Sequence, residues 1–329
     1  MKAIVYKKYG PPVDVLELRE VEKPAPVEDK VLVEVHAASV NYSDWAFVRG
    51  KPFLVRLMGS GLIKPKNTIL GADIAGRVEA VGSRVTQFQP GDEVFGDISD
   101  CGWGGFAEYA AVPENAIALK PVNLTFDEAA AVPQAAVVAL QGLRDEGQIQ
   151  PGQRVLINGA SGGIGTFAVQ IAKSFGANVT GVCSTRNLDM VRSIGADHVI
   201  DYTQEDFTHT EQGYELILAT AGYRSIYDYE RALSPKGIYV MSGGTLKQVF
   251  QAGLLGPRIS KVGGKKLVNL AAKPSREDLD FVKELIEAGA VEPVIDRIYP
   301  LSEVSEALRY YGGGHARGKV VITVEQNSK

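Results

Sequence analysis

A glycine-rich turn between a strand-like run and a helix-like run constrains this chain more than any other feature. The apolar run Arg154–Asn158 leads into glycine-dense residues 159–165, and residues 166–173 have a helical pattern. In this context the glycines let the backbone approach a pyrophosphate, and the helix start offers it N–H groups. Ala160 replaces the first glycine of the common pattern. The turn therefore predicts a dinucleotide site at Ala160, Ser161, Gly162, Gly163, Ile164 and Gly165.

Size and charge narrow the class of protein. The 329 residues are enough for two domains. A net charge of −4 argues against nucleic-acid and membrane-surface partners, which require a basic excess. The two cysteines, Cys101 and Cys183, cannot build a disulfide framework or a cysteine-rich zinc site. No apolar run has the length of a bilayer span, and the first residues resemble a strand rather than a signal segment, so we expect a cytoplasmic protein.

Strand and helix patterns divide the chain into three segments. Short strand-like runs separated by turn signals fill residues 1–124 and predict a compact, barrel-like β-domain. Strands and helices alternate over residues 125–272, which predicts an α/β fold with a doubly wound, six-stranded parallel sheet. Residues 273–329 end in a strand-like run at 319–324, which we expect to return to the first domain. The six runs expected in the parallel sheet are 154–158, 179–183, 198–200, 216–219, 238–241 and 266–271.

Short motifs in a fixed order carry a family resemblance over essentially the whole chain. The chain resembles the medium-chain dehydrogenase/reductase superfamily, and specifically its zinc-free quinone oxidoreductase-like branch. The resemblance implies a GroES-like catalytic domain built from both chain ends, a Rossmann nucleotide-binding domain between them, and catalysis in the cleft. Besides the glycine turn, the motifs are KAIV at 2–5, VNYSD at 40–44, LGADIAG at 70–76, VGS at 81–83, PGDEV at 90–94, GFAEY at 105–109, GAD at 195–197 and HARGKVV at 315–321.

Three positions depart from the pattern of the family. Val138 stands where a threonine near the cofactor is usual, and Ala219 stands where the fourth strand of the sheet commonly carries an aspartate. Residues 47–67 form a longer segment than in compact quinone reductases. We expect this segment to shape one wall of the substrate entrance.

The positions that hold zinc in metal-dependent relatives lack zinc ligands in this chain. The resemblance places the first ligand at Asn41 and the histidine ligand at Ala72, and residues 134–137 contain no thiolate. The four histidines show no ligand spacing. We therefore expect no metal. Without a Lewis acid, the chemistry favours reduction of electrophilic substrates such as quinones and enones, for which hydrogen bonds to the accepting oxygen suffice.

The residues after the second strand of the parallel sheet favour NADPH over NADH. An acid at this point would bind the 2′-hydroxyl of NAD, but no carboxylate occurs there before Asp189. The hydroxyl of Ser184 and the guanidinium of Arg186 can bind a 2′-phosphate instead, although Arg186 also fits a solvated cation at a helix start. Tyr202 matches a tyrosine that closes over this phosphate in the family.

The resemblance also assigns the reacting end of the cofactor. Ser242 and Gly243 are expected beside the nicotinamide ribose, and Lys319 is expected to face the cleft. Asn41 is the candidate donor to the acceptor oxygen or the carboxamide, and Asp44 is expected to orient its loop. Tyr42 is either a proton donor or a packed aromatic residue.

These features leave three hypotheses of function. The first is an NADPH-dependent quinone or enone reductase, and the second is a zinc-free alcohol or carbonyl oxidoreductase. The third is an NADPH-binding protein with a structural or interaction role. Family analogy also predicts a homodimer formed through the strand edge at residues 267–271.

Overall fold

The chain forms two compact units. The computed structural model describes residues 1–57, 61–209, 213–221, 223–244, 248, 251 and 264–325. Unit 1 comprises Met1–Gln134, Pro274–Glu287 and Pro293–Lys329, and unit 2 comprises Ala135–Lys273 and Ala288–Glu292. The first boundary therefore falls at residue 134 rather than at the expected residue 124.

Residues 288–292 belong to unit 2, although the sequence predicts that the whole of residues 273–329 lies with the first domain. The side chain of Gln170 donates to the carbonyl oxygen of Glu292 at 2.8 Å, and Glu292 N–H donates to Gln170 Oε1 at 2.9 Å. This paired amide contact fixes the backbone of residue 292 to a helix of unit 2.

Unit 1 is built on a largely antiparallel sheet of seven strands. The strand order is β14-β15-β3-β4-β5-β7, with β6 also paired to β3. Alternating burial explains these strands, because β3 and β4 direct residues such as Val33 and Ile74 into the core. The strands are β3 (Lys30–Val40), β4 (Asp73–Val81), β5 (Glu93–Asp97), β6 (Tyr109–Pro113), β7 (Ile117–Leu119), β14 (Ile295–Pro300) and β15 (Lys319–Thr323); β1 (Lys2–Val5) and β2 (Glu17–Glu20) form a separate pair.

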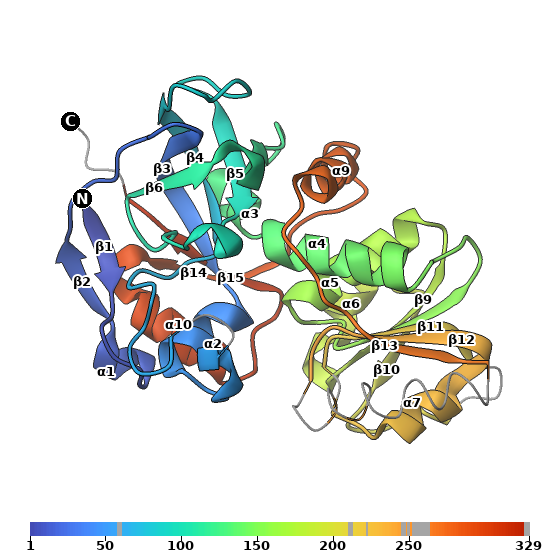
Figure 1. Ribbon diagram of the computed structural model, residues 1–329. Helices are drawn as coiled ribbons and strands as arrows, with labels where there is room; N and C mark the ends of the chain where they lie inside the picture. Colours follow the sequence, from blue (N-terminus) through green and yellow to red (C-terminus); the bar gives the residue numbers. More distant parts are fainter. Residues whose placement is uncertain are drawn as a thin grey trace. The chain divides into compact units, whose positions relative to one another are not determined.

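The last strand returns to the first segment of the chain, as expected from the sequence. β15 pairs antiparallel with β3, with Val320 opposite Val40, and parallel with β14. In Figure 1, β15 and β14, in the red end of the colour range, lie beside the blue strand β3. Both ends of the sequence therefore contribute to one sheet.

Helices complete the core of unit 1. Leu308 of α10 packs in the same buried cluster as Val33 and Ile74. The helices of this unit are α1 (Pro12–Val15), α2 (Tyr42–Arg49), α3 (Phe126–Ala130), α9 (Arg276–Glu287) and α10 (Val304–Gly312). The alanine-rich residues that follow Thr125 are divided between α3 and α4 (Pro133–Gln141), and Pro133 begins the second helix.

Unit 2 contains the expected six-stranded parallel sheet. Its strand order is β10-β9-β8-β11-β12-β13. The central strands are buried on both faces, as Leu156 and Ile217 show, which explains their continuous apolar runs. The elements are β8 (Arg154–Asn158), α5 (Gly163–Ser174), β9 (Asn178–Cys183), α6 (Leu188–Ser193), β10 (His198–Asp201), β11 (Tyr214–Ala219), α7 (Ile226–Ala232), β12 (Leu233–Met241) and β13 (Lys266–Asn269).

β6 begins later than the apolar pattern of residues 106–112 suggests. The run at 106–112 becomes β6 only from Tyr109. Before that point Phe106 N–H donates to Leu70 O, and Ala107 forms an isolated bridge with Ala3. These pairings with other segments hold residues 106 and 107 outside the β3–β6 ladder.

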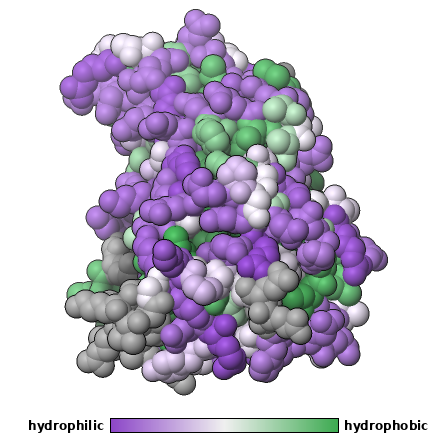
Figure 2. Space-filling model, turned by 90° about the vertical axis from the view of Figure 1, so that its right-hand side faces the viewer, coloured by the Kyte–Doolittle hydropathy of each residue, from purple (hydrophilic) through white to green (hydrophobic). Residues whose placement is uncertain are grey.

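The surface in Figure 2 is mainly hydrophilic, and its apolar side chains form small separate groups. Within the part of the chain that the structure describes, no helix is both long enough and apolar enough to cross a membrane.

Two glycines of the turn differ in the space around them and allow a matched test of the fold. A Cβ atom at Gly165 would lie 2.0 Å from the carbonyl oxygen of Gly159, whereas at Gly162 the nearest atom would be 3.6 Å away. We expect Gly165→Ala to lower the free energy of unfolding by about 1–3 kcal/mol because the backbone must shift. Gly162→Ala should cost less than about 1 kcal/mol. Urea denaturation would measure both, and equal losses would contradict this account of the turn.

Candidate active site

The glycine turn of unit 2 has the geometry of an anion cradle. β8 ends at Asn158, Gly162 precedes the first residue of α5, and no described side chain caps this helix terminus. Gly159 has a φ of +89°, and a Cβ there would meet Thr220 Oγ1 at 2.5 Å. The close approach of the turn to its helix and the open space at Gly162 fit a pyrophosphate against the helix N–H groups.

The ends of three parallel strands are joined beside this turn. Ala219 of β11 lies opposite Asn158 of β8, and Thr220 donates from its N–H to Asn158 O at 2.9 Å. On the other side, Ser242 N–H and Gly243 N–H donate to Ala219 O at 3.0 and 3.2 Å. The structure thus brings Ser242 and Gly243 to the same sheet edge as the glycine turn.

The next two strands bring together the residues expected at the 2′-phosphate. Cys183 at the end of β9 is opposite Asp201 at the end of β10, so Ser184 and Tyr202 follow neighbouring strand ends. Tyr202 N–H donates to Cys183 O at 3.1 Å, and its side chain is 55% exposed. Arg186 lies exposed in the turn Thr185–Asn187 that follows β9.

Asp201, the last residue of β10, is a carboxylate at this edge of the sheet. It was not predicted from the sequence, because only the residues that follow the second strand were considered. Asp201 accepts hydrogen bonds from Thr185 Oγ1 and from the backbone N–H and hydroxyl of Thr203. The Thr185 hydroxyl contributes most to holding the pKa of Asp201 below its ordinary value. The Asp201 carboxylate is therefore hydrogen-bonded to the turns that follow both β9 and β10.

In unit 1, α2 begins beside a buried carboxylate. Asp44 is fully buried, and its two oxygens accept the backbone N–H groups of Asn41 at 2.8 Å and Gly71 at 2.9 Å. Burial raises the pKa of Asp44 to about 7, and these two donors oppose the rise. Asp44 thus joins the start of α2 to the loop before β4.

The side chain of Asn41 belongs to a buried polar cluster that we call the Asp73 cluster, formed by Ser39, Asn41, Asp73 and Lys319. Asn41 Nδ2 donates to Asp73 Oδ2 at 2.9 Å, and Lys319 Nζ donates to Asn41 Oδ1 at 2.5 Å. Lys319 Nζ also lies 3.3 Å from Asp73 Oδ2, and Ser39 Oγ donates to the same oxygen at 3.0 Å. Pairing of β15 and β4 with β3 brings these residues together.

Two further residues extend the cluster, and no motif in the sequence marked them as site residues. Gln134 donates from its N–H to Asp73 Oδ1 at 3.0 Å and from Nε2 to Asp97 Oδ2 at 3.2 Å. Burial, followed by the charge of Asp73, raises the pKa of Asp97 to about 6. Ser43 Oγ donates to Gln134 Oε1 at 3.3 Å, which ties α2 to this extension.

The first residue of α2 is accessible to solvent. Tyr42 is 56% exposed, and its ring centroid lies 5.9 Å from that of Trp45 in a tilted arrangement. This residue is therefore not packed in the core.

The segment at residues 47–67 folds back on the N-terminal part of unit 1. Residues 58–60 lie outside the described residues. Tyr9 Oη donates to Gly61 O at 2.5 Å, and the guanidinium of Arg56 stacks on the Tyr9 ring at 4.3 Å. Phe53 is 61% exposed and Leu57 is 59% exposed. The segment thus presents apolar side chains to solvent.

The donor set at the expected metal position does not fit zinc. Asn41 is bound to Lys319 and Asp73, Ala72 offers no ligand atom, and the ammonium of Lys319 places a positive charge in the cluster. Across residues 1–57, 61–209, 213–221, 223–244, 248, 251 and 264–325, no three His, Cys, Asp or Glu side chains are grouped as metal ligands.

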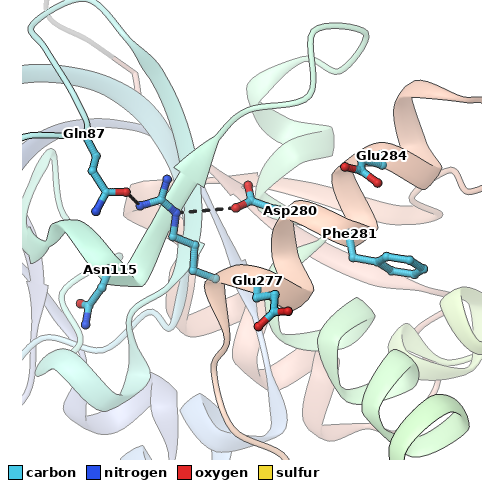
Figure 3. Close-up of a pocket in the computed structure, with 7 residues that line it drawn as sticks. Gln87, Asn115, Glu277, Asp280, Phe281 and Glu284 are labelled. Carbon is cyan, nitrogen blue, oxygen red and sulfur yellow. Dashed lines mark hydrogen bonds and ion pairs between the residues drawn. The ribbon is translucent and has the colours of Figure 1, made fainter.

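An open hollow of about 600 Å³ lies elsewhere on unit 1, between α9 and the loop after β4. Figure 3 shows Gln87 and Asp280 on its two sides. Arg276 donates a hydrogen bond to Gln87, forms an ion pair with Asp280 and stacks over Phe88 at 5.2 Å. Its guanidinium is therefore bound to side chains of the protein itself. The hollow has neither the glycine turn nor the Asp73 cluster, and we do not assign the active site to it.

Comparison with known proteins identifies the family. Residues 27–122 match the family model described as alcohol dehydrogenase GroES-like domain, and residues 194–322 match that described as zinc-binding dehydrogenase. A chloroplastic quinone-oxidoreductase homolog of Spinacia oleracea is 36% identical over 335 residues, which are 98% of this chain and 98% of the relative. An NADPH-dependent alkenal/one oxidoreductase of Arabidopsis thaliana, also chloroplastic, is 35% identical over 98% of this chain and 79% of the relative.

Among solved structures, the quinone oxidoreductase of Coxiella burnetii superimposes with a TM-score of 0.84 at 29% identity, covering 99% of each chain. The chain therefore belongs to the medium-chain dehydrogenase/reductase superfamily, in its quinone oxidoreductase-like branch, which confirms the resemblance and the fold class. It is an oxidoreductase that uses a nicotinamide cofactor and a small-molecule substrate.

The raised pKa values predict how stability depends on pH. Burial raises the pKa of Asp44 from 3.8 to about 7, so the folded protein binds more protons than the unfolded chain between these values. The free energy of unfolding should therefore fall as the pH rises through this window, by at most about 4 kcal/mol from Asp44, and level off above it.

Urea denaturation between pH 4 and 8 measures this dependence. Asp97 contributes in the same direction up to about pH 6, so Asp44→Asn should remove the part of the slope between about pH 6 and 7. Asp189→Asn, at a fully exposed carboxylate, is the control and should leave the profile unchanged. An Asp44→Asn profile that overlays the wild type would refute the assignment.

Proposed function

We propose that this protein transfers a hydride from NADPH to a quinone or an α,β-unsaturated carbonyl compound without a catalytic metal. The observation that carries the proposal is the donor set around Asn41, where an amide and an ammonium replace the ligands that zinc needs. An alcohol substrate would need a Lewis acid to stabilise its alkoxide, whereas an electrophilic acceptor needs only hydrogen bonds to its oxygen. The names of the spinach and Arabidopsis relatives support the same acceptor classes.

The residues of unit 1 supply orientation and hydrogen bonds. Among the described residues, Asp73 alone accepts from the Asn41 amide nitrogen, so the second N–H of this amide is available to an acceptor oxygen or to the cofactor carboxamide. Lys319 holds the amide oxygen and so fixes which way the amide faces. Asp44 keeps the Asn41 backbone in place. Tyr42, an exposed residue, is the proposed proton donor.

The bound cofactor supplies the hydride, and unit 2 supplies its binding groups. We assign the pyrophosphate to residues 160–165 and the 2′-phosphate to Ser184, Arg186 and Tyr202. The assignment to NADPH is supported by a hydroxyl and a guanidinium after β9 and by the commitment of Asp201 to Thr185 and Thr203. Ser242 and Gly243 are the proposed neighbours of the nicotinamide ribose, and Lys319 acts on that end of the cofactor directly or through Asn41.

A steady-state screen of NADPH oxidation tests the proposal. We expect turnover with quinones, enals and enones, little with simple aldehydes and ketones, and no loss of rate after treatment with a chelator. Preferential reduction of simple carbonyls would favour an alcohol or carbonyl oxidoreductase. Tight cofactor binding without turnover on any acceptor would favour a structural role. Inactivation by chelation that zinc reverses would refute the metal-free mechanism.

Arg186→Ala tests the choice of cofactor. Loss of a hydrogen bond from a charged group should raise the KM for NADPH about tenfold, with a small effect on kcat and on the KM for NADH. Arg192→Ala removes the same charge from the following helix, where Arg192 pairs with Asp189 at 3.0 Å, and it should leave the ratio of the two KM values unchanged. An unchanged ratio in Arg186→Ala would refute its role at the 2′-phosphate.

Two properties of the intact protein stay predictions. Among the strands that the structure describes, β13 lies at one edge of the six-stranded sheet, and such an edge can pair with a second copy, so we propose a homodimer there. Light scattering in solution tests this assembly.

The expected cytoplasmic location is tested by cell fractionation. The names of both plant relatives place those proteins in the chloroplast.

A further inference from the structure

A buried amide joins the glycine turn to the residues that follow β9. Asn187 is 4% exposed, and its Nδ2 donates to Ser161 Oγ at 3.0 Å and to Ser184 Oγ at 3.3 Å. Ser161 belongs to the turn after β8, and Ser184 follows the last residue of β9. One side chain therefore contacts both segments to which the proposed function assigns phosphate groups.

The direction of these hydrogen bonds decides what the two serines can bind. A serine hydroxyl has one proton to donate and two lone pairs to accept with. Because the Asn187 amide donates to both oxygens, neither serine uses its own proton in this contact, and each keeps it for another acceptor. A phosphate oxygen is such an acceptor, because a phosphate is predominantly deprotonated at neutral pH.

The other end of the amide makes no competing contact among the described residues. Asn187 Oδ1 is buried and has no hydrogen-bond partner among the described residues. The oxygen therefore does not compete for the two hydroxyl protons. The backbone holds the side chain in place, since Asn187 N–H donates to Ser184 O at 2.9 Å.

We propose that Asn187 is a positioning residue that presets the hydroxyls of Ser161 and Ser184 as donors to phosphate and thereby contributes to selection of the 2′-phosphorylated cofactor. This inference rests on the proposed function, because it requires Ser184 to contact the 2′-phosphate. Asn187 itself does not touch the phosphate. It acts by determining which groups the two serines offer.

The test uses cofactor fragments, so it does not depend on turnover. Calorimetry measures the dissociation constants of 2′,5′-ADP and 5′-AMP, whose ratio reports the contribution of the 2′-phosphate. Asn187→Asp keeps the shape of the side chain but turns the donor into an acceptor, which takes both hydroxyl protons and adds a negative charge. We expect it to reduce the preference for 2′,5′-ADP at least tenfold, whereas Asn187→Ala should reduce it about threefold.

A matched control separates this effect from a general change of charge. Asn178→Asp adds the same charge at the exposed first residue of β9, at the opposite end of the strand, and should leave the preference unchanged. A merely structural role of Asn187 would lower the melting temperature and weaken both fragments alike without changing their ratio. That result would overturn the inference.

A double-mutant cycle keeps the test decisive if Asn187→Asp does not fold. If Asn187 acts through Ser184, Asn187→Ala should have little further effect on the preference in a Ser184→Ala background. Fully additive effects would overturn the inference. Equal binding of 2′,5′-ADP and 5′-AMP by the wild type would instead refute the NADPH assignment, and a wild-type preference that survives in Asn187→Asp would refute only the role of Asn187.

Discussion

The buried carboxylate of Asp73 is the constraint on which unit 1 depends. Asp73 is completely inaccessible to solvent, and a buried charge is tolerated only when a partner charge and hydrogen bonds replace its water. Its donors are Ser39, Asn41, Gln134 and Lys319, which come from separate parts of the sequence. Asn41 and Lys319, which we propose to orient the acceptor, are thus also needed to stabilise the buried Asp73 carboxylate.

In unit 2, the main constraint is the space around the glycine turn between β8 and α5. Its turn leaves N–H groups uncapped at the start of α5. The hydroxyl of Thr220 beside Gly159 and the carbonyl oxygen of Gly159 beside Gly165 leave no room for a Cβ atom at either glycine. The proposed pyrophosphate site is therefore formed by backbone rather than by charged side chains. The residues proposed to select the cofactor, Ser184, Arg186 and Asn187, lie at the turn after β9, where the adenosine end is expected.

Features that depend on local pattern were predictable from the sequence. The six strands of the parallel sheet follow from apolar runs bounded by turn residues. The return of β15 to the first segment follows because no parallel partner remained for it. The Asp73 cluster could not be predicted in this way, because Asp73 and Lys319 are 246 positions apart and only the register of β3 with β4 and β15 brings them together. The role of Asn187 was equally hidden, since an asparagine before a helix is most simply interpreted as its cap.

The return of the last strand also sets an order of events during synthesis. Asp73 is made 246 residues before the lysine that neutralises it. At about 5–20 residues per second, the wait lasts roughly 12–50 s. During that interval unit 2 can be synthesised in full, while the carboxylate in the nascent sheet has no cation beside it. Unit 1, although its synthesis starts first, is thus the last to be completed, and the Asn41 amide acquires its orientation only when β15 pairs with β3.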